Sequence, residues 1–440
     1  MKKLLSLLFA VFLCCGLLAC SLSPVNYEVH ALALAAEPIS VGYGDAMQED
    51  YQSFLDKLDL FAARLTAAVY AVDDKESNLC ISPVSVYMAL ALAVECTDGE
   101  TREELLSAVG VTYDEVKSFT KMLYSFSNKE YGYTDRNENK RVTAFVELAN
   151  SIWADNDVSL KGAGVEDLAN NYNADLFRVD FGSNEGERAI AAYIKDKTHG
   201  LIDGDVELSP ETLITLINTF YLKDIWNMDG DDLSMTQEIY EFENADGSTT
   251  ETKLLQGYYF NGRAYEGEGY TSFYTRTNHG FTIKFILPDE GRTLAEVFTA
   301  ENIYASNNAS GYDYADDVNK IFHHTRVLFP EYTASYDKDI SAVLKNAFGI
   351  KKVFDLAQSD FSSITEAQIG IRAVLHKCKL TVDKKGIEGA AATAPDGGGS
   401  PRPSDYTNVY HDFVVDRAFG FVLIDNYGTV LFSGAVNTLK

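Results

Sequence analysis

The stretch that decides the fold is Val374–Ala394, VLHKCKLTVDKKGIEGAAATA, which lies near the end of a chain of 440 residues. Apolar side chains alternate with polar ones at its start, which predicts a strand with one buried face. That face carries Val374, His376, Cys378, Leu380 and Val382. A run of small residues follows that could pair in a sheet or pack as a helix. It continues instead into PDGGGSPRPSDY (395–406), whose Gly, Pro and Ser content is typical of a loop.

The N-terminus has the pattern of an export signal. Lys2 and Lys3 precede an apolar run over 4–18 that is too short to span a bilayer comfortably. The run ends in LLAC (17–20), which resembles the lipobox of bacterial lipoproteins and predicts lipidation of Cys20; an ordinary secretory signal is the alternative. We expect a lipoprotein signal peptide over 1–19, a tether over 20–46 and one folded domain over 47–440. The protein is expected to be exported, as a cell-surface lipoprotein or an extracellular protein.

Composition excludes several classes of function. The chain has 65 acidic against 37 basic residues and a formal charge of −28, and such a surface repels phosphate backbones, so we expect no nucleic-acid partner. Outside the signal and the lipidation site, Cys80, Cys96 and Cys378 form no even disulfide framework and are expected to be buried, inert thiols. Because no Cys-x-x-Cys spacing, nucleotide motif or complete EF-hand loop occurs, we expect no metal and no cofactor.

Hydrophobic periodicity predicts an order of helices and strands along the chain. Residues 84–94 are apolar on every side, which predicts a helix buried at the centre of the domain. Thr101 and Glu104 match a capping box and predict that a second helix begins there. Further helices are expected over 51–71, 165–200, 293–302 and 337–348. Strands are expected over 142–153, 212–226, 237–288 and 419–436, the last two ranges with turns inside them.

Four blocks of the chain are specific when they are taken together. They are NLCISPVSVYMALALA (78–93), INTFYLKDIW (217–226), DFSSIT (360–365) with the opening stretch after it, and DRAFGFVLIDNYGTVLFSGAVN (416–437). In this order they resemble the serpin family of protease inhibitors, over a region from about residue 51 to Lys440. The resemblance implies an α+β serpin fold with a large central mixed β-sheet, two smaller sheets, about eight to nine helices and an exposed reactive-centre loop over about 384–412.

The resemblance also implies a metastable fold, whose central sheet can part and admit the reactive loop as an extra strand once a protease attacks it. The hinge of this loop must be solvated in one state and packed in the other, which small side chains allow. It comprises Gly386, Ile387, Glu388, Gly389, Ala390, Ala391, Ala392, Thr393 and Ala394. Gly386 would act as a pivot, because glycine tolerates backbone angles closed to other residues. Ile387 is larger than the family's usual residue, and its bulk is expected to slow insertion.

The same blocks imply a polar cluster beneath the point where the sheet opens. It comprises Ser82, Ser85, Asn218 and His376, with Trp226 as the aromatic residue where the inserting loop first passes. Buried hydroxyl, amide and imidazole groups need mutual hydrogen bonds, and rearranging them can gate strand separation. A catalytic Ser-His pair is the alternative, but these blocks supply neither a third carboxylate nor a Gly-x-Ser-x-Gly elbow.

Two charges are inverted relative to the family pattern. Lys384 stands where the family usually carries a glutamate, and Glu331 stands where it carries the basic partner. We therefore expect a swapped Glu331–Lys384 ion pair that closes the top of the sheet, worth on the order of 1 kcal/mol if exposed. Two merely solvated side chains are the alternative.

Two counts place the scissile bond differently. Counting forward from the end of the strand with the family's usual spacing gives Ser400, whereas counting back from Phe419 gives Thr407. Ser400 and Arg402 each precede a proline, which lacks the N–H and the shape that most serine proteases need. The bond between Tyr406 and Thr407 is free of that objection.

These features predict an inhibitor rather than an enzyme. The expected partner is a serine protease of the elastase-, chymotrypsin- or subtilisin-like type, with papain-like cysteine proteases as a second class. Membrane contact is expected through the lipid anchor only, and the protein is expected to be a monomer. The alternative is a serpin fold that is cleaved as a substrate or serves as a surface scaffold, which Ile387 and Pro395 favour because bulk and a missing ladder donor hinder insertion. An enzyme would require turnover of an ester or a peptide.

Overall fold

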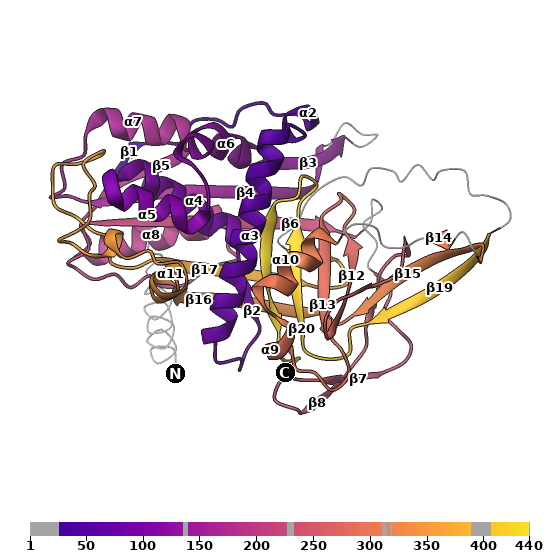
Figure 1. Ribbon diagram of the computed structural model, residues 1–440. Helices are drawn as coiled ribbons and strands as arrows, with labels where there is room; N and C mark the ends of the chain where they lie inside the picture. The colour runs from indigo at the N-terminus through magenta and orange to yellow at the C-terminus, as the bar shows by residue number, and fades with distance from the viewer. Residues whose placement is uncertain are drawn as a thin grey trace, which may run out of the picture.

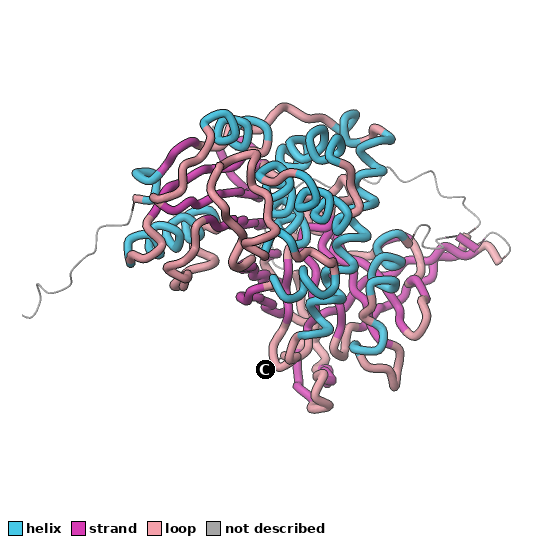
Figure 2. Tube along the Cα trace, turned by 60° about the vertical axis from the view of Figure 1, so that its left-hand side comes forward, coloured by secondary structure: helices cyan, strands magenta, loops and turns pink. Residues whose placement is uncertain are grey.

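The computed structural model describes residues 26–134, 140–226, 233–309, 315–316, 319–388 and 406–439. Most helices cover the part of the molecule that holds the central sheet, and the remainder is built mainly from strands (Figures 1 and 2). The predicted signal peptide and Cys20 lie outside the described residues.

The described residues contain ten α-helices, and eight of them are longer than a single turn. These eight are α3 (Glu49–Val72), α4 (Pro83–Cys96), α5 (Gly99–Val109), α6 (Tyr113–Phe126), α7 (Gly162–Asn171), α8 (Asn184–Lys197), α10 (Ala300–Asn308) and α11 (Ser341–Ala347). The two short helices are α2 (Tyr43–Ala46) and α9 (Leu294–Val297), and short 3-10 turns are η1 (Tyr27–His30) and η2 (Lys352–Phe354). In this part of the chain no helix is both long and apolar enough to cross a membrane.

The strands form a large central sheet that continues into a second sheet. The central sheet has the order β1 (Ala31–Ala33), β5 (Ala174–Val179), β4 (Lys140–Asp155), β6 (Ile214–Ile225), β18 (Gly386–Glu388), β17 (Leu375–Val382) and β16 (Tyr332–Asp339), with β3 (Lys129–Thr134) beside β4. It mixes parallel and antiparallel pairs, because β4 runs parallel to β5 and antiparallel to β6. The second sheet has the order β2 (Leu79–Ile81), β21 (Val430–Val436), β20 (Phe419–Ile424), β13 (Thr282–Pro288), β12 (Tyr270–Arg276) and β11 (Tyr265–Glu266).

A third sheet is assembled around one strand. It comprises β15 (Ile321–Phe329) with β9 (Leu255–Gln256), β10 (Phe260–Asn261), β14 (Ala315–Asp316) and the parallel strand β19 (Thr407–Val414). The hairpin of β7 (Tyr240–Glu243) and β8 (Thr249–Thr252) stands apart. The α+β fold with one large sheet and smaller sheets is therefore confirmed, and so are the antiparallel strands expected over 237–288.

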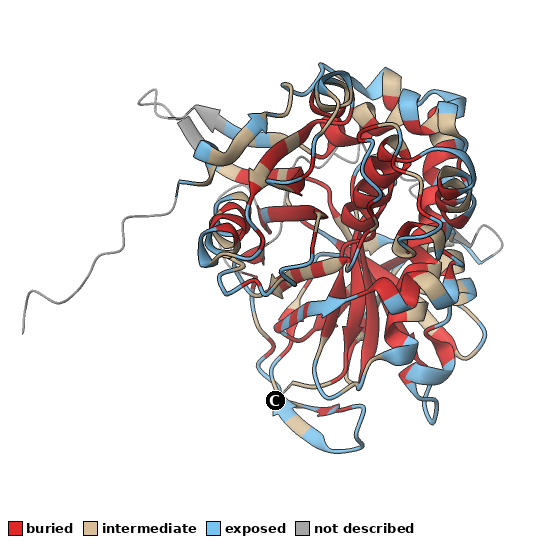
Figure 3. Ribbon diagram, turned by 90° about the vertical axis from the view of Figure 1, so that its left-hand side faces the viewer, coloured by how far each residue is buried: buried red, intermediate tan, exposed pale blue. Residues whose placement is uncertain are grey.

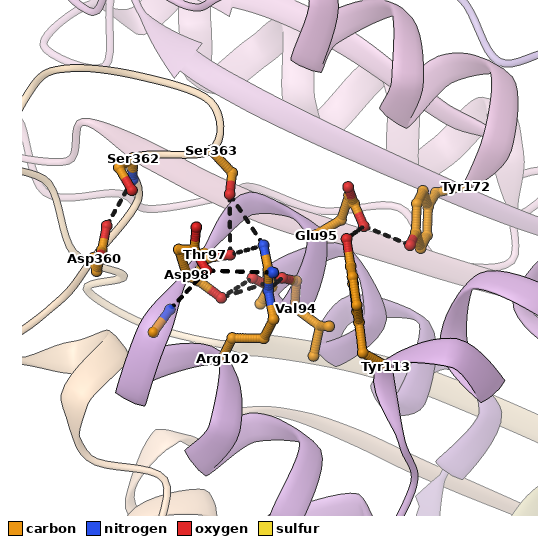
Figure 4. A network of polar contacts seen from close by, with 12 residues as sticks. Val94, Glu95, Thr97, Asp98, Arg102, Tyr113, Tyr172, Asp360, Ser362 and Ser363 are labelled. Carbon is orange, nitrogen blue, oxygen red and sulfur yellow. Dashed lines mark hydrogen bonds and ion pairs between the residues drawn. The ribbon is translucent and has the colours of Figure 1, made fainter.

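Helix α4 is the central buried helix that the sequence predicts. All of its residues except Glu95 are buried, and Figure 3 shows buried residues gathered along the strands and the helix surfaces that face them. The DFSSIT segment fixes the end of the helix, because the hydroxyl of Ser363 donates to the carbonyl of Thr97 at 3.1 Å (Figure 4). Arg102 Nε donates to the carbonyl of Val94 at 3.1 Å. These donors satisfy carbonyl groups that a helix end leaves free.

The capping box predicted for the second helix is wrong. Helix α5 begins two residues before Thr101, at Gly99, and the carboxylate of Asp98 accepts the N–H of Gly99 at 2.8 Å. Glu104 is used elsewhere, because its carboxylate accepts the backbone N–H of Lys352 at 2.7 Å. Asp98 is itself a favourable N-cap residue, and it lies three positions before Thr101.

Two of the predicted helical ranges also contain strands. The range 165–200 contains β5 between α7 and α8, and the range 337–348 begins with the end of β16 before α11. Short strands enclosed by helical patterns are difficult to separate by periodicity alone.

The N-terminal segment differs from the predicted tether. Its β1 pairs antiparallel with β5 at the edge of the central sheet. The ring of Tyr27 packs edge-on against Phe177 and Tyr193, with centroid distances of 5.8 and 5.3 Å. This aromatic packing holds the segment before α3 against the domain, so the folded part of the chain begins well before residue 47.

Candidate functional site: the loop hinge and the slot in the central sheet

The first three residues of the predicted hinge form a strand inside the central sheet. Strand β18 lies antiparallel between β6 and β17, with Ile387 opposite Asp224 on one side and Val382 on the other. Gly389–Ala394 lie outside the described residues. The structure therefore describes a hinge whose start already lies in the sheet.

Gly386 is required here by close approach rather than by an unusual backbone angle. A Cβ atom at this position would overlap the carbonyl oxygen of Asp224 on the neighbouring strand. The φ angle of Gly386 is not positive, so the predicted pivot role through special backbone angles does not apply in this state. Glycine is instead the residue that lets β18 pass against β6.

Ile387 points into the core and is 1% exposed. It shares the buried face of Val382, its neighbour across the ladder. The structure thus accommodates the large side chain at the first inward position, which was expected to hinder insertion. The rate of insertion stays a prediction.

Glu388 is held by two side chains of β6. Lys223 Nζ lies 3.2 Å from its carboxylate, and the hydroxyl of Tyr221 donates to the same oxygen at 3.0 Å. Desolvation and the charge of Glu388 raise the pKa of Tyr221, so Tyr221 donates throughout the physiological range. Because Lys223 and Glu388 are about half exposed, their pair contributes at most about 1 kcal/mol. We call these three side chains the latch.

The chain between β17 and β18 is fixed at the top of the sheet. Trp226 Nε1 donates to the carbonyl of Asp383 at 2.7 Å, and Glu331 accepts the backbone N–H of Lys384 at 2.9 Å. The structure therefore brings Glu331 and Lys384 together, although this contact uses the main chain of Lys384. The side-chain ion pair stays a prediction. Trp226 is buried and packs edge-on against Phe329. Its role beside an inserting loop stays a prediction.

Strands β6 and β17 are the two wall strands on either side of β18, and beyond β18 the described residues show no pairing between them. Within the described residues, β6 pairs with β4 and β18, and β17 pairs with β16 and β18, but no ladder connects β6 to β17. We call the space between them, from Glu388 toward Leu375, the slot. Among the described residues no strand pairs with the backbone groups along its edges, and such edges readily accept another strand.

A pocket lies on each face of the sheet at the slot. On the α8 face a cavity of about 10 Å³ is lined by Ile194, Val206, Ile217, Asn218, Thr219, Leu375 and Lys377. On the α4 face a second cavity of about 10 Å³ is lined by apolar residues that include Leu216 of β6 and Val374, which immediately precedes β17. Each cavity has room for about one water molecule, so an added strand would need β6 and β17 to part.

The predicted polar cluster is divided between the two walls of the slot. On the β17 side, His376 Nε2 accepts the backbone N–H of Ser82 at 3.1 Å, and burial lowers the pKa of His376 to about 4. On the β6 side, Asn218 Nδ2 donates to Asn150 Oδ1 at 2.6 Å. Ser85 is also buried, at the start of α4. His376 is therefore neutral at pH 7, and its ring nitrogen accepts from the main chain of Ser82 rather than from a hydroxyl.

Within the described part of the chain, two polar atoms of this cluster have no hydrogen-bond partner. They are the hydroxyl oxygen of Ser82 and Oδ1 of Asn218, and both are buried. Leaving a buried polar atom unsatisfied costs about 1–3 kcal/mol. The cluster is thus incomplete while the slot is open, and a polar group arriving in the slot would find a free acceptor at Asn218.

Asn150 is a member of the cluster that sequence reasoning missed. It lies in β4, directly opposite Asn218 across the ladder. The signal was available, because an asparagine in the centre of the apolar strand over 142–153 needs a buried partner. The identity of that partner depends on the register between β4 and β6, which the sequence does not specify.

The candidate scissile bonds fall into two groups. Ser400 and Arg402 lie outside the described residues. Thr407 is the first residue of β19, and its N–H donates to the carbonyl of Lys320 at 2.8 Å. The ring of Tyr406 packs edge-on against Phe322 at a centroid distance of 5.5 Å. A bond whose amide is held at a strand edge does not present the free extended segment that a protease needs, so this structure argues against cleavage between Tyr406 and Thr407, and the loop ends before the predicted residue 412.

We searched the described residues for groups of side chains that could bind a metal ion. No three His, Cys, Asp or Glu side chains of the described ranges come together as a metal-binding group. The three cysteines Cys80, Cys96 and Cys378 are free and buried, as expected.

Comparison with known proteins supports this architecture. A family model described as Serpin (serine protease inhibitor) matches residues 56–439. The chain is 27% identical over 368 residues to alpha-1-antiproteinase S of Cavia porcellus, covering 82% of this chain and 84% of that protein. Among solved structures, the thermophilic serpin tengpin in its native state superposes with a TM-score of 0.70 at 23% identity, covering 92% of this chain and 98% of that chain. Serpin48 of the insect Tenebrio molitor gives a TM-score of 0.69 at 21% identity, covering 90% and 100%.

Proposed function

Because the chain belongs to the serpin family, we propose that it is a suicide inhibitor of a serine protease, with papain-like cysteine proteases as a second target class. Protease inhibition is the general function that family membership supports. In the proposed reaction the enzyme's hydroxyl adds to the scissile carbonyl, the C–N bond breaks, and the leaving amine takes the proton. The loop then remains esterified to the enzyme while its severed N-terminal part extends β18 down the slot.

The observation that carries this proposal is the position of β18. Its three residues already pair with both wall strands, and the slot continues beyond them. The alternative, a fold that is only cleaved as a substrate, would not require a partly filled slot. A strand that is already started also avoids the cost of nucleating a new one.

Under this proposal, the register of β18 would set the position of each remaining hinge residue in the sheet. If β18 continued in the same register, position 389 would lie opposite Leu380 and position 394 opposite Leu375. Strand β17 begins at Leu375, so the six small residues Gly389–Ala394 match the free part of β17 residue for residue. Pro395 would fall just beyond this strand, where a missing N–H costs no ladder bond on that side.

The same register would account for Thr393, the one residue of the run 390–394 that is not an alanine. Side chains alternate between faces, so positions 389, 391 and 393 would share the core face of Ile387. Thr393 would lie opposite His376 on β17 and opposite Asn218 on β6. Its hydroxyl could donate to Asn218 Oδ1, the buried acceptor that lacks a partner. Insertion would then complete the polar cluster.

The decisive experiment is an incubation with elastase-, chymotrypsin-, trypsin- and subtilisin-like proteases. We expect a covalent complex with at least one enzyme that survives boiling in detergent, and mass spectrometry of the released C-terminal peptide would locate the cut bond. Cleavage of the loop by these enzymes without any stable complex would contradict the proposal and support the substrate alternative.

A matched pair of variants tests the slot itself. Ala391→Glu would carry a charge to the core face opposite Cys378, whereas Ala390→Glu would lie on the other face, opposite the half-buried Lys379. We expect Ala391→Glu to abolish the stable complex while cleavage continues, because burying an unpaired carboxylate is prohibitive. Ala390→Glu should still form the complex. Equal complex formation by both variants would argue against insertion along β17.

Export and anchoring are part of the proposal. We propose that the protein is a monomeric, exported lipoprotein attached through Cys20. Metabolic labelling with a fatty acid should label the protein and not its Cys20→Ala variant. Label in both proteins, or in neither, would contradict the anchor without affecting the inhibitory mechanism.

A further inference from the structure

Two of the three buried cysteines are in contact. Cys80 in β2 and Cys378 in β17 are 298 positions apart in the chain, and their Sγ atoms are 3.3 Å apart. Strand β16 lies between β17 and β2 in the order of the sheet, so this contact joins strands that are not neighbours in the ladder. His376, two residues from Cys378, accepts the N–H of Ser82, two residues from Cys80. The core face of β17 thus meets the segment leading into α4 at two successive points.

We propose that Cys80 and Cys378 are a redox site, whose reversible disulfide fastens the β17 wall of the slot to β2. A disulfide has an S–S length of about 2.05 Å, so the two sulfur atoms need to approach by roughly 1.3 Å. Cys96 is not an alternative partner for Cys80. It ends α4, which is 14 residues long, and therefore lies about 20 Å along the helix axis from the start of that helix.

The chemistry needs a disulfide oxidant, such as oxidised glutathione or a thiol–disulfide oxidoreductase. One cysteine thiolate attacks a sulfur of the oxidant, forms a mixed disulfide and releases one thiol. The second cysteine thiolate attacks the cysteine sulfur of the mixed disulfide, closes the Cys80–Cys378 bond and releases the second thiol. Two electrons pass to the oxidant, and the two cysteine protons end on the released thiols. A dithiol reductant reverses both steps.

Burial of the two thiols determines the stage of folding at which the disulfide forms most readily. Both sulfur atoms are enclosed in the core, and desolvation raises the pKa of the Cys80 thiol. The thiolate is the reactive form, so the folded, reduced protein should oxidise slowly. The bond therefore forms most readily while the chain folds in an oxidising compartment, before β17 closes over β2. Once formed, the bond is reduced slowly, because the same burial limits the access of a reductant.

The position of the pair gives the bond a role in the slot. In the register of β18, position 391 of the inserted strand would lie opposite Cys378. Admitting a strand separates its neighbours by a further strand spacing, about 4.8 Å, so β6 or β17 has to move. A bond to β2, which is paired with β21 in the second sheet, would fix β17 and leave the movement to β6. This consequence rests on the proposed function, whereas formation of the bond does not.

The first test is chemical. The protein and its Cys96→Ser variant are refolded with oxidised or with reduced glutathione, digested without reduction and mapped by mass spectrometry. We expect a Cys80–Cys378 linked peptide pair in both proteins after oxidation. Oxidation should also raise the melting temperature by about 3–5 °C, an increase that reductant removes and that Cys378→Ala lacks. Full alkylation of Cys80 and Cys378 after oxidative refolding, or a linkage to Cys96, would overturn the proposal.

The second test separates the redox site from the inhibitory mechanism. The oxidised and reduced forms are compared for the ratio of cleaved inhibitor to stable complex with one protease. We expect the ratio to rise on oxidation, because slower opening gives hydrolysis more time, and to be insensitive to redox state in Cys378→Ala. An unchanged ratio, with the linked peptide present, would overturn the role in the slot. If the bond forms but neither redox form traps any protease, the proposed function fails and the redox site stands.

Discussion

The second sheet and the central sheet of this molecule differ in how completely their inner strands are paired. Strand β20 pairs with β21 from Phe419 to Ile424 and with β13 from Gly420 to Ile424. Strands β6 and β17 stand in the middle of the central sheet, yet beyond Glu388 each is paired on one side only with strands that the structure describes. The same chain therefore contains a completed sheet and an uncompleted one. Among the inner strands of these two sheets, the described residues have their unpaired edges at the slot, so the metastability that we propose would be local to it.

The largest expected effect is the difference between intact and loop-cleaved protein. Filling the slot with six residues would add backbone hydrogen bonds to both β6 and β17. At about 1 kcal/mol for each hydrogen bond, the free energy of unfolding would increase by on the order of 10 kcal/mol. We expect the cleaved form to melt at least about 10 °C above the intact form, measured by calorimetry. Equal melting temperatures would show that the slot is not filled.

A core substitution in the second sheet should distinguish the two regions. Phe421 of β20 is fully buried, and its ring lies 5.5 Å from that of Tyr332. Phe421→Ala should lower the free energy of unfolding by about 3–5 kcal/mol. Because the second sheet is complete in both states, the loss should be the same in the intact and the cleaved protein. A loss confined to the intact form would mean that the two sheets are energetically coupled.

Acid should affect the two regions in opposite directions. The pKa of His376 is lowered to about 4 by burial, so between about pH 6.5 and pH 4 the unfolded chain binds a proton that the folded chain does not. The stability that neutral His376 provides is complete above pH 6.5, and up to about 3 kcal/mol is lost as the pH falls through this window. Denaturant unfolding at several pH values should show the loss, and His376→Gln should reduce it.

Asp425, in the turn between β20 and β21, is the matched comparison. Burial raises the pKa of Asp425 to about 6, although the N–H groups of Thr429 and Tyr427 partly oppose this shift. Here the folded chain binds the extra proton between about pH 6 and pH 4, so this group favours the folded state as the pH falls. Asp425→Asn should therefore steepen the acid sensitivity that His376→Gln relieves. The same sign for both variants would contradict the assignment.

The smallest expected effect is at the latch. Lys223→Ala and Glu388→Gln should each change the free energy of unfolding by less than about 1 kcal/mol, because the pair is half exposed and screened by salt. A double-mutant cycle at low and high salt would measure the coupling. A larger coupling that persists at high salt would mean that the latch, rather than the strand pairing of β18, holds the hinge in the sheet.

Local patterns predicted those parts of the slot whose cause is local. The alternation at His376, Cys378, Leu380 and Val382 predicted the buried face of β17, and the run over 84–94 predicted α4. Asn150 could not be assigned to the cluster, because its partnership with Asn218 is created by strand register. The contact between Cys80 and Cys378 could not be predicted either, since it joins residues 298 positions apart.

The N-terminal segment and α5 show two other reasons for error. Tyr27 packs on Phe177 and Tyr193, which lie far from it in the sequence. The local pattern of the N-terminal segment therefore gives no sign that it is structured. At α5 the box of Thr101 and Glu104 was a valid local signal, but the N-cap Asp98 lies earlier in the same turn. A longer-range use for Glu104, at the N–H of Lys352, removed it from the cap.

If Gly389–Ala394 fill the free length of β17 as proposed, the odd and even positions of this run are not equivalent. Adding or deleting a single residue in this run would exchange the two faces of everything that follows. The hydroxyl of Thr393 would then be directed at α8, and a plain methyl group would meet Asn218. Adding or deleting two residues would keep each side chain on its face of the sheet and would change only the length of the inserted strand, by about 7 Å. The loop is thus expected to tolerate length changes in pairs.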